Sequence, residues 1–263
     1  MKKFIAPGHW FSMMYPQTWQ ESVDEEGSFL FFNHDVWTGN FRISAFRGES
    51  DYGAEAVREE LNSHREARRV KVGDLNCAYS AESFVEEGVQ YVQHLWITGI
   101  RDVAFECSFT ARPEDSVKEA EETSASLEIP APGVKPAAEL IPIRMSEVMQ
   151  IDDAFDYVSR QIKEQLKKDF TGQEEDIAHI QMLIDKGVWG AKNREAWLAV
   201  GITLCVILAN EVDGVEWLSL IDGNREEPVI RYEDIVIDPM KLVWSKVRAG
   251  ETIHLTEIYQ QLL

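Results

Sequence analysis

Cysteine is scarce in this chain, and its few residues show no pattern. The three cysteines in 263 residues, Cys77, Cys107 and Cys205, have neither CxxC nor any other metal-ligand spacing. An odd and sparse count argues against a disulfide framework and favours a reducing compartment. Cys107 and Cys205 lie in apolar stretches, where cysteine acts as a small hydrophobe. The cysteine content therefore excludes a small protein held together by disulfides.

Long hydrophobic runs are also missing. The longest apolar stretch, residues 197–209, has 13 residues, whereas a membrane-spanning helix needs about 20. The opening MKKFIAPGHWF has two lysines but no apolar core of a signal peptide. We therefore expect a soluble, cytoplasmic protein that does not bind membranes.

Basic residues are outnumbered, with 26 Lys and Arg against 46 Asp and Glu and a net charge of -20. Residues 1–128 hold 12 bases and 23 acids, and the remainder holds 14 and 23, so both halves are acidic. Such a field repels phosphate backbones and anionic lipids. Nucleic-acid binding is therefore excluded as a primary function. Two interpretations stay open: the charge serves solubility, or it attracts a basic protein partner.

Recognisable catalytic motifs are absent from the sequence. It has neither GxGxxG nor GxxxxGK[ST] for phosphates, no HExxH for zinc and no GxSxG nucleophile elbow. The loop after Asp222 lacks the spacing of an EF-hand. We therefore expect no cofactor and no metal, and we lean against an enzyme.

Two histidines, His94 and His179, are candidates for chemical sites. His179 follows Asp176 by three residues and Glu175 by four, so the three side chains could share one helix face. A metal would need further ligands, and a solvated acidic face is the favoured interpretation. His94 and Cys107 lie on neighbouring predicted strands, but Cys107 alternates in phase with core residues, which favours an inert thiol. No catalytic or metal-binding residue is assigned.

Two tryptophans in loops are the candidate interaction residues. Trp37 lies in HDVWTGN and Trp189 in KGVWGAKN, each near glycine and between predicted elements. Loops often carry function, and tryptophan is enriched among interface hot spots. The alternative is that each ring fills the core of its own domain, because large aromatics usually bury most of their area.

Four of the nine prolines fall between residues 127 and 143. Proline fixes φ and removes a donor, so neither a helix nor a central strand survives such a run. We expect two domains, 1–128 and 144–263, joined by a proline-rich strap at 129–143. The strap is more apolar than a free linker, so we predict that it packs along the seam between the domains. Its apolar residues are Leu127, Ile129, Val134, Leu140, Ile141 and Ile143.

The first half predicts an antiparallel sheet with helices packed on it, in an α+β fold. Period-two alternation is clearest at 101–111, and a polar DEEG turn at 24–27 separates the first strands. The expected strands are 9–15, 28–33, 41–46, 70–84, 89–98 and 101–111, with helices at 52–67 and after Pro113.

The segment YPQTW at 15–19, followed by a hairpin and this element order, resembles the PsbP-like fold. The resemblance covers roughly the first half of the chain. PsbP-like domains are mostly binding or scaffold modules, so the resemblance implies a binding role. No catalytic residues accompany the motif, and none are carried over.

The second half predicts a helix-rich α+β domain with a small antiparallel sheet. The expected helices are 152–170, 173–186 and 193–210, followed by strands at 215–222 and 228–239 and short helices to the end. The helix 193–210 is apolar nearly all round, which is typical of a buried central helix.

From Trp197 onward the chain resembles an uncharacterised bacterial domain family. The matching residues are Trp197, Gly201, Trp217, Asp222-Gly223, Pro239, Val247-Arg248 and Gly250-Glu251. This resemblance names a fold and leaves the chemistry open.

Taken together, the sequence predicts a non-enzymatic protein-binding module, with masking of a basic toxin or nuclease as one concrete version. The alternative is small-molecule binding or catalysis in a cleft where the two domains meet.

Overall fold

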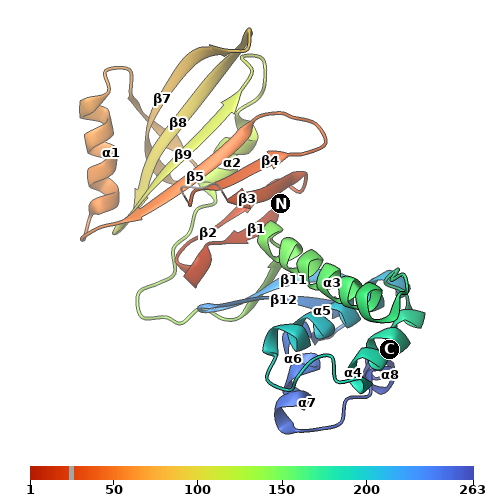
Figure 1. The fold of residues 1–263 in the computed structure, drawn as a ribbon. Coiled ribbons are helices and arrows are strands. Elements are labelled where there is room, and N and C mark those ends of the chain that lie inside the picture. The colour runs from red at the N-terminus through yellow and green to blue at the C-terminus, as the bar shows by residue number, and fades with distance from the viewer. Residues whose placement is uncertain (24–26) are drawn as a thin grey trace. The chain divides into compact units, whose positions relative to one another are not determined.

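The computed structural model describes residues 1–23 and 27–263, and the chain divides into two compact units. The first unit is Met1–Ala137 and the second is Ala138–Leu263. The first is built on a large antiparallel sheet, and the second combines helices with a small antiparallel sheet (Figure 1). The α+β fold class predicted from the sequence is confirmed for both halves.

The first unit contains a seven-stranded antiparallel sheet in the order β3-β4-β5-β9-β8-β7-β6. Alternate residues of β9 point into the core, where Val103, Phe105, Cys107 and Phe109 are at most 1% exposed. This is the period-two pattern that predicted the strand. The strands are β3 (Trp19–Val23), β4 (Phe29–Asn33), β5 (Asn40–Arg47), β6 (Arg68–Val72), β7 (Leu75–Glu86), β8 (Val89–Ile100) and β9 (Val103–Ala111).

A two-stranded sheet of β1 (Lys2–Ile5) and β2 (Ser12–Tyr15) adds to the same core. Phe4 lies 5.3 Å from Phe31 and 4.8 Å from Phe29, measured between ring centroids. Helix α2 (Lys118–Ala125) is tied to β2, because the Met14 amide donates to Ser126 Oγ at 2.7 Å. The sequence did not predict β1, whose Phe4 contacts these distant rings. It did not predict β3 either, whose Trp19 ring stacks on Phe109 of β9 with centroids 6.1 Å apart.

Helix α1 (Tyr52–Ser63) packs against β8 through two glycines. A Cβ atom on Gly99 would lie 2.2 Å from the Cα of Gly53. Only two residues without side chains allow the two backbones to approach this closely. The helix ends at Ser63, earlier than the predicted 67.

Two further expectations for the first unit need correction. The segment 70–84 was predicted as one strand, but the chain turns at Gly73, whose φ is +58°, and forms two paired strands, β6 and β7. The first strand was predicted at 9–15, whereas residues Pro7–His9 form a 3-10 turn and β2 begins at Ser12. The predicted DEEG turn spans 24–27, and its residues 24–26 lie outside the described residues.

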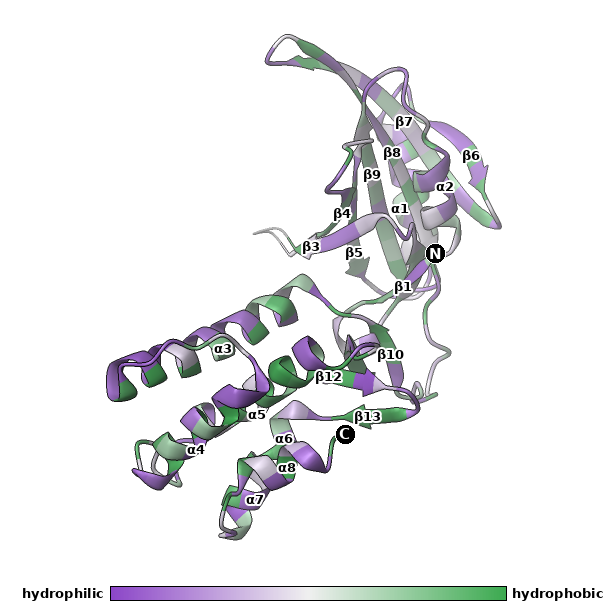
Figure 2. Ribbon diagram, turned by 90° about the vertical axis from the view of Figure 1, so that its right-hand side faces the viewer, coloured by the Kyte–Doolittle hydropathy of each residue, from purple (hydrophilic) through white to green (hydrophobic). Residues whose placement is uncertain are grey.

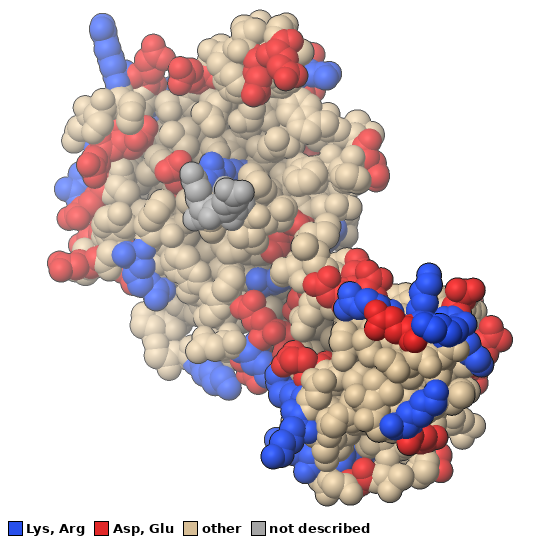
Figure 3. Space-filling model, viewed as in Figure 1, with Lys and Arg blue, Asp and Glu red and all other residues tan. Residues whose placement is uncertain are grey.

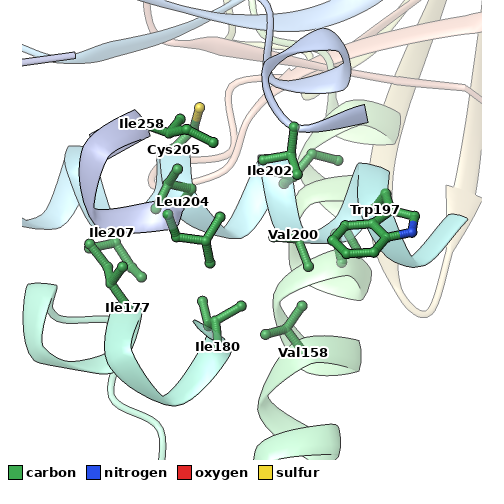
Figure 4. Packing of buried hydrophobic residues seen from close by; sticks show 14 of the residues in the cluster. Val158, Ile177, Ile180, Trp197, Val200, Ile202, Leu204, Cys205, Ile207 and Ile258 are labelled. Atoms are coloured by element: carbon green, nitrogen blue, oxygen red, sulfur yellow. The ribbon is translucent and has the colours of Figure 1, made fainter. Parts of the chain in front are cut away.

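The second unit is centred on α5 (Arg194–Glu211), and twelve of its residues are buried (Figure 4). Asn193 caps this helix, accepting a hydrogen bond from the Ala196 amide at 3.3 Å. Val158 of α3 (Met145–Leu166) and Ile180 of α4 (Ile177–Asp185) pack against it, both 0% exposed. The predicted buried central helix is therefore confirmed.

Helix α3 begins seven residues earlier than the predicted Asp152. The Glu147 side chain reaches back to the Arg144 backbone, and Ser219 donates a hydrogen bond to the same carboxylate. Arg144, 5% exposed, pairs with Glu226 at 3.2 Å. These buried partners come from distant strands, so they fix a helix start that local sequence did not reveal.

The second sheet has four antiparallel strands in the order β10-β11-β12-β13. Its strands are β10 (Glu139–Pro142), β11 (Glu216–Asp222), β12 (Arg225–Tyr232) and β13 (Ile235–Ile237), and the remaining helices are α6 (Pro239–Leu242), α7 (Trp244–Ala249) and α8 (Leu255–Gln260). Asp238 caps α6, and Gly250 ends α7 with φ of +75°. Gly201 of α5 is required by α6, because a Cβ there would lie 2.3 Å from the Pro239 carbonyl oxygen.

The proline-rich segment 129–143 is not one element. Leu127, just before it, is 5% exposed in the core of the first unit, while Ile141 is 2% exposed in the second. Residues 131–135 between them are exposed. Prolines tolerate an edge strand but not a central one, which suits β10 at the edge of its sheet. Packing of the segment along a seam stays a prediction.

Candidate functional site

The β7–β8 hairpin extends beyond its neighbours in the first unit (Figure 1). Strand β6 stops pairing at Tyr79 and β9 stops at Val92, whereas β7 and β8 stay paired out to Glu86 and Val89. All residues from 81 to 90 are exposed. A two-residue turn with positive φ at Glu87 and Gly88 closes the hairpin, which is the geometry that suits twisted strands.

The end of this hairpin contains apolar residues, which Figure 2 colours green on the ribbon. Phe84 is 37% exposed and Val89 is 39% exposed. Phe84 pairs with Tyr91 across the two strands, and their rings stack with centroids 5.6 Å apart. Because side chains alternate between faces and Val89 lies two residues before Tyr91, Val89 points to the same side.

Trp37 joins this surface from the loop between β4 and β5. Its ring meets Tyr91 edge-on, with centroids 5.8 Å apart, and the Arg112 guanidinium lies 5.8 Å from the indole. Trp37 Nε1 donates to Asn40 Oδ1 at 2.9 Å. We call Trp37, Phe84, Val89 and Tyr91 the hairpin patch.

The loop that carries Trp37 is held in place by local contacts. Asn33 Oδ1 accepts hydrogen bonds from the amides of Asp35 and Val36, which forms a turn of the type that asparagine favours. Gly39 has φ of +130°, and a Cβ there would lie 2.3 Å from the Phe109 ring. The loop is therefore anchored to the core while the Trp37 ring stays half-buried at the surface.

Acidic residues flank the hairpin patch. Between Ser80 and Tyr91 the sequence contains Glu82, Glu86 and Glu87 and no lysine or arginine. Glu82 and Glu86 lie two residues either side of Phe84, so they share its face. Elsewhere on the molecule, red acids and blue bases are interspersed over the face drawn in Figure 3. The hairpin end thus combines apolar surface with negative charge.

The structure places Trp189 in the interior of the second unit, where it is 5% exposed. Its ring lies edge-on to Trp197 at 6.1 Å and near Tyr157 at 6.5 Å. Trp197 Nε1 donates to the Gly190 carbonyl at 3.1 Å, which closes the loop over the core. A partner reaches this indole only if the unit opens, so Trp37 and not Trp189 is the tryptophan available to a partner in the folded chain.

The cluster around His179 is a structural one. Asp176, 3% exposed, accepts hydrogen bonds from the Thr171 amide at 2.8 Å and from His179 Nδ1 at 3.0 Å. Burial by itself raises the pKa of this carboxyl, but these hydrogen bonds outweigh it and hold the pKa below its usual range. His179 Nε2 lies 2.8 Å from Lys168 Nζ, a cation rather than a metal ligand.

His94 and Cys107 do not meet. His94 Nδ1 shares a hydrogen bond of 2.8 Å with the Tyr79 hydroxyl, and burial lowers the pKa of His94. Cys107 is opposite Trp96 and 0% exposed, and burial raises the pKa of its thiol to about 12. A protonated, enclosed thiol is a poor nucleophile.

A cavity of about 360 Å³ lies within the second unit, between α3, α5 and α6. Three alanines, Ala154, Ala196 and Ala199, form part of its wall, and two carboxylates, Asp153 and Glu195, also line it. Because the alanine side chains are small, they leave this volume unfilled. The lining contains no basic residue. The cavity could hold a compact apolar molecule that carries a hydrogen-bond donor or a cation.

Within residues 1–23 and 27–263, no three His, Cys, Asp or Glu side chains gather closely enough to hold a metal ion. No helix in this described part combines the length and apolar character that a bilayer crossing requires.

The two units define the class as an α+β protein with a sheet-based first half and a helix-rich second half. The model of the domain of unknown function DUF3805 matches residues 1–152, more than half of the chain. The chain therefore belongs to the DUF3805 family. The domain of unknown function DUF3806 matches residues 176–259, so the expected fusion to an uncharacterised C-terminal domain is supported.

Two solved structures resemble the chain to very different degrees. A crystal structure from Bacteroides thetaiotaomicron VPI-5482 is 56% identical, with a TM-score of 0.93 over 99% of this chain and 97% of that one. The solution structure of cyanobacterial PsbP from Synechocystis is 13% identical, with a TM-score of 0.27 over 49% of this chain and 92% of that one. The second likeness carries no argument, so the PsbP-like resemblance stays a prediction. Among the curated proteins, none matches this chain.

Proposed function

We propose that this chain is a non-enzymatic protein-binding module that recognises a basic protein partner through the hairpin patch. The observation that carries the proposal is the hairpin end itself, where Phe84 and Val89 are over a third exposed beside Trp37 and Tyr91. Masking of a basic toxin or nuclease is one version of this function.

The chemistry of the patch suits a protein interface. Aromatic residues are enriched at interfaces, and tryptophan and tyrosine are frequent hot spots. The Trp37 and Tyr91 rings are held by each other and by Asn40, so little side-chain entropy is lost when a partner packs against them.

The charge of the chain supports a basic partner. The net charge is -20, and Glu82, Glu86 and Glu87 lie along the hairpin end that carries Phe84 and Val89. Opposite charge raises the association rate most strongly at low salt, where screening is weak. Binding through this surface should therefore weaken as salt rises.

The test compares two matched double variants in a pull-down from the cells that produce the protein. The patch variant is Phe84→Ser/Val89→Ser. The control is Ile235→Ser/Val236→Ser, because these β13 residues of the second unit are 60% and 46% exposed. Retained proteins are identified by mass spectrometry at low and high salt.

We expect one protein of positive net charge to bind the wild-type chain and the control at low salt, and to be lost from the patch variant. Its recovery should fall at high salt. The proposal is wrong if no protein is retained at low salt, or if the patch variant retains the same protein as well as the control does.

A second candidate function is small-molecule binding in the cavity of the second unit. Its volume of about 360 Å³ falls within the usual range of ligand pockets, roughly 300–1,000 Å³. Thermal shift with a panel of organic amines tests it. A shift that is lost in Ala199→Phe, a variant expected to fill the cavity, would support this candidate over the first.

A further inference from the structure

In the part of the chain that the structure describes, the outer edge of β7 has no strand paired with it over its last seven residues. Pairing of β6 with β7 ends at Arg68 and Tyr79, while β7 continues to Glu86. Among the described residues, Ser80–Glu86 therefore pairs with β8 alone. Residues 81–86 are exposed, so their side chains are accessible along this edge.

Such an edge presents unpaired backbone groups. In an antiparallel pair, alternate residues exchange hydrogen bonds with the partner strand, and the others point their N–H and C=O groups away from it. Seven residues extend over roughly 24 Å at about 3.4 Å each, which matches an ordinary strand. Exposed edges of this kind accept extended peptides by strand addition.

The side chains along the edge decide which strand fits. Glu82, Phe84 and Glu86 point to one face of β7, with the carboxylates two residues before and after the ring. Residues directly opposite one another on paired strands interact, and opposite charges stabilise while like charges destabilise. The matching strand therefore carries a basic residue, an apolar residue and a basic residue at alternate positions.

A second copy of this chain fits the edge poorly. If two β7 edges paired in antiparallel fashion about Phe84, Glu82 of each copy would lie opposite Glu86 of the other. Two such like-charge pairs disfavour the dimer. The same carboxylates that discourage self-association leave the edge open to a basic strand.

We infer that Ser80–Glu86 is a strand-addition site that binds an extended basic–x–apolar–x–basic segment of the partner. This inference rests on the proposed function and specifies how that partner is held: backbone hydrogen bonds along β7 provide the pairing, while Glu82, Phe84 and Glu86 select the sequence.

The test uses synthetic peptides and the full chain. The probe is the labelled heptapeptide Thr-Lys-Thr-Val-Thr-Lys-Thr, and its binding is followed by fluorescence anisotropy at low salt. Two analogues carry N-methyl groups, one on the Lys and Val amides and the other on the threonine amides. Each analogue keeps the charge and side chains but loses the donors of one edge of the strand.

We expect the parent peptide to bind and one N-methyl analogue to bind at least tenfold more weakly, while the other stays close to the parent. Glu82→Gln/Glu86→Gln should weaken the parent severalfold and reduce its salt dependence. Asp152→Asn/Asp156→Asn, which removes two exposed acids from α3, is the matched control and should bind as the wild type does.

Strand addition would be overturned if the parent peptide did not bind. It would also be overturned if both analogues bound as tightly as the parent, because such binding would indicate contact through side chains alone. A dimer in sedimentation velocity that the peptide dissociates would assign the edge to a second copy. In each case the pull-down with Phe84→Ser/Val89→Ser still decides the proposed function separately.

Discussion

Trp37 and Trp189 have the same local sequence signature and opposite positions in the two units. Each lies in a loop near glycine, yet Trp37 is half-buried in a surface cluster and Trp189 is 5% exposed in a core. The first unit places its loop beside a hairpin that extends past the sheet. The second folds its loop over the core, where the indole lies close to the rings of Trp197 of α5 and Tyr157 of α3. Whether a loop tryptophan is buried therefore depends on the element that packs next to its loop.

The largest expected difference between the units comes from removing these two rings. Trp189→Ala should destabilise the second unit by about 3–5 kcal/mol, because it leaves a large cavity among Trp197 and its neighbours. Trp37→Ala should cost less than about 1 kcal/mol, since its ring is partly solvated. Urea unfolding of the full chain measures both. Equal losses in the free energy of unfolding for the two variants would contradict the contrast between a buried Trp189 and a surface Trp37.

The close glycine contacts should show the next largest effects. Gly99→Ala in the first unit and Gly201→Ala in the second each place a Cβ within 2.3 Å of backbone atoms. Because backbone atoms cannot easily move aside, we expect each of these two substitutions to lower the free energy of unfolding by about 1–3 kcal/mol. Gly190→Ala, with nothing within 4 Å of its added Cβ, is the control.

Thermal unfolding should show a clear loss for Gly99→Ala and Gly201→Ala and almost none for Gly190→Ala. A wild-type melting temperature for Gly99→Ala would mean that α1 does not need its approach to β8.

Asp176 should make the stability of the second unit depend on pH. Its folded-state pKa is lowered, so its contribution is fully present above the unfolded pKa and is lost as pH falls through the folded value. Asp176→Asn should cost about 1–3 kcal/mol at neutral pH, where charge-assisted hydrogen bonds are lost. It should also flatten the decline in stability below about pH 4, near the ordinary carboxyl pKa.

Urea unfolding between neutral and acidic pH checks this prediction. Asp169→Asn, at an exposed position, should behave as the wild type does. A decline in Asp176→Asn as steep as in the wild type would assign the acid sensitivity to other carboxyls.

The smallest expected change in stability is at the hairpin patch. Phe84→Ser/Val89→Ser removes side chains that are over a third exposed, so we expect a change within about 0.5 kcal/mol of the wild type. The measurement is the same urea unfolding. A large loss would show that the hairpin end supports the fold and would weaken its assignment to binding.

Much of the architecture could be predicted where one face of an element is buried. The alternation of apolar and polar residues in β9 and the apolar character of α5 on all sides each indicate directly which residues are buried. The elements that could not be predicted depend on distant partners: β1 on the Phe4 contacts, and the start of α3 on Ser219 and Glu226. Local sequence carries no record of such contacts.

The candidate site could be predicted only in part. Trp37 was recognised from its loop, but Phe84, Val89 and Tyr91 were assigned to ordinary strands. A signal was present, because Glu82, Phe84 and Glu86 share one face and no single side stays apolar beyond residue 81. That pattern is typical of a hairpin that leaves the core. Trp189 was indistinguishable from Trp37 because burial depends on the helix that its loop covers.

The most direct test of the central claim is hydrogen exchange of the full chain with and without the Thr-Lys-Thr-Val-Thr-Lys-Thr peptide. If the first unit binds through its hairpin while the core of the second stays closed, exchange should slow at residues 80–86 and stay unchanged across α5. Protection confined to the second unit, or no protection at residues 80–86 with saturating peptide, would contradict it.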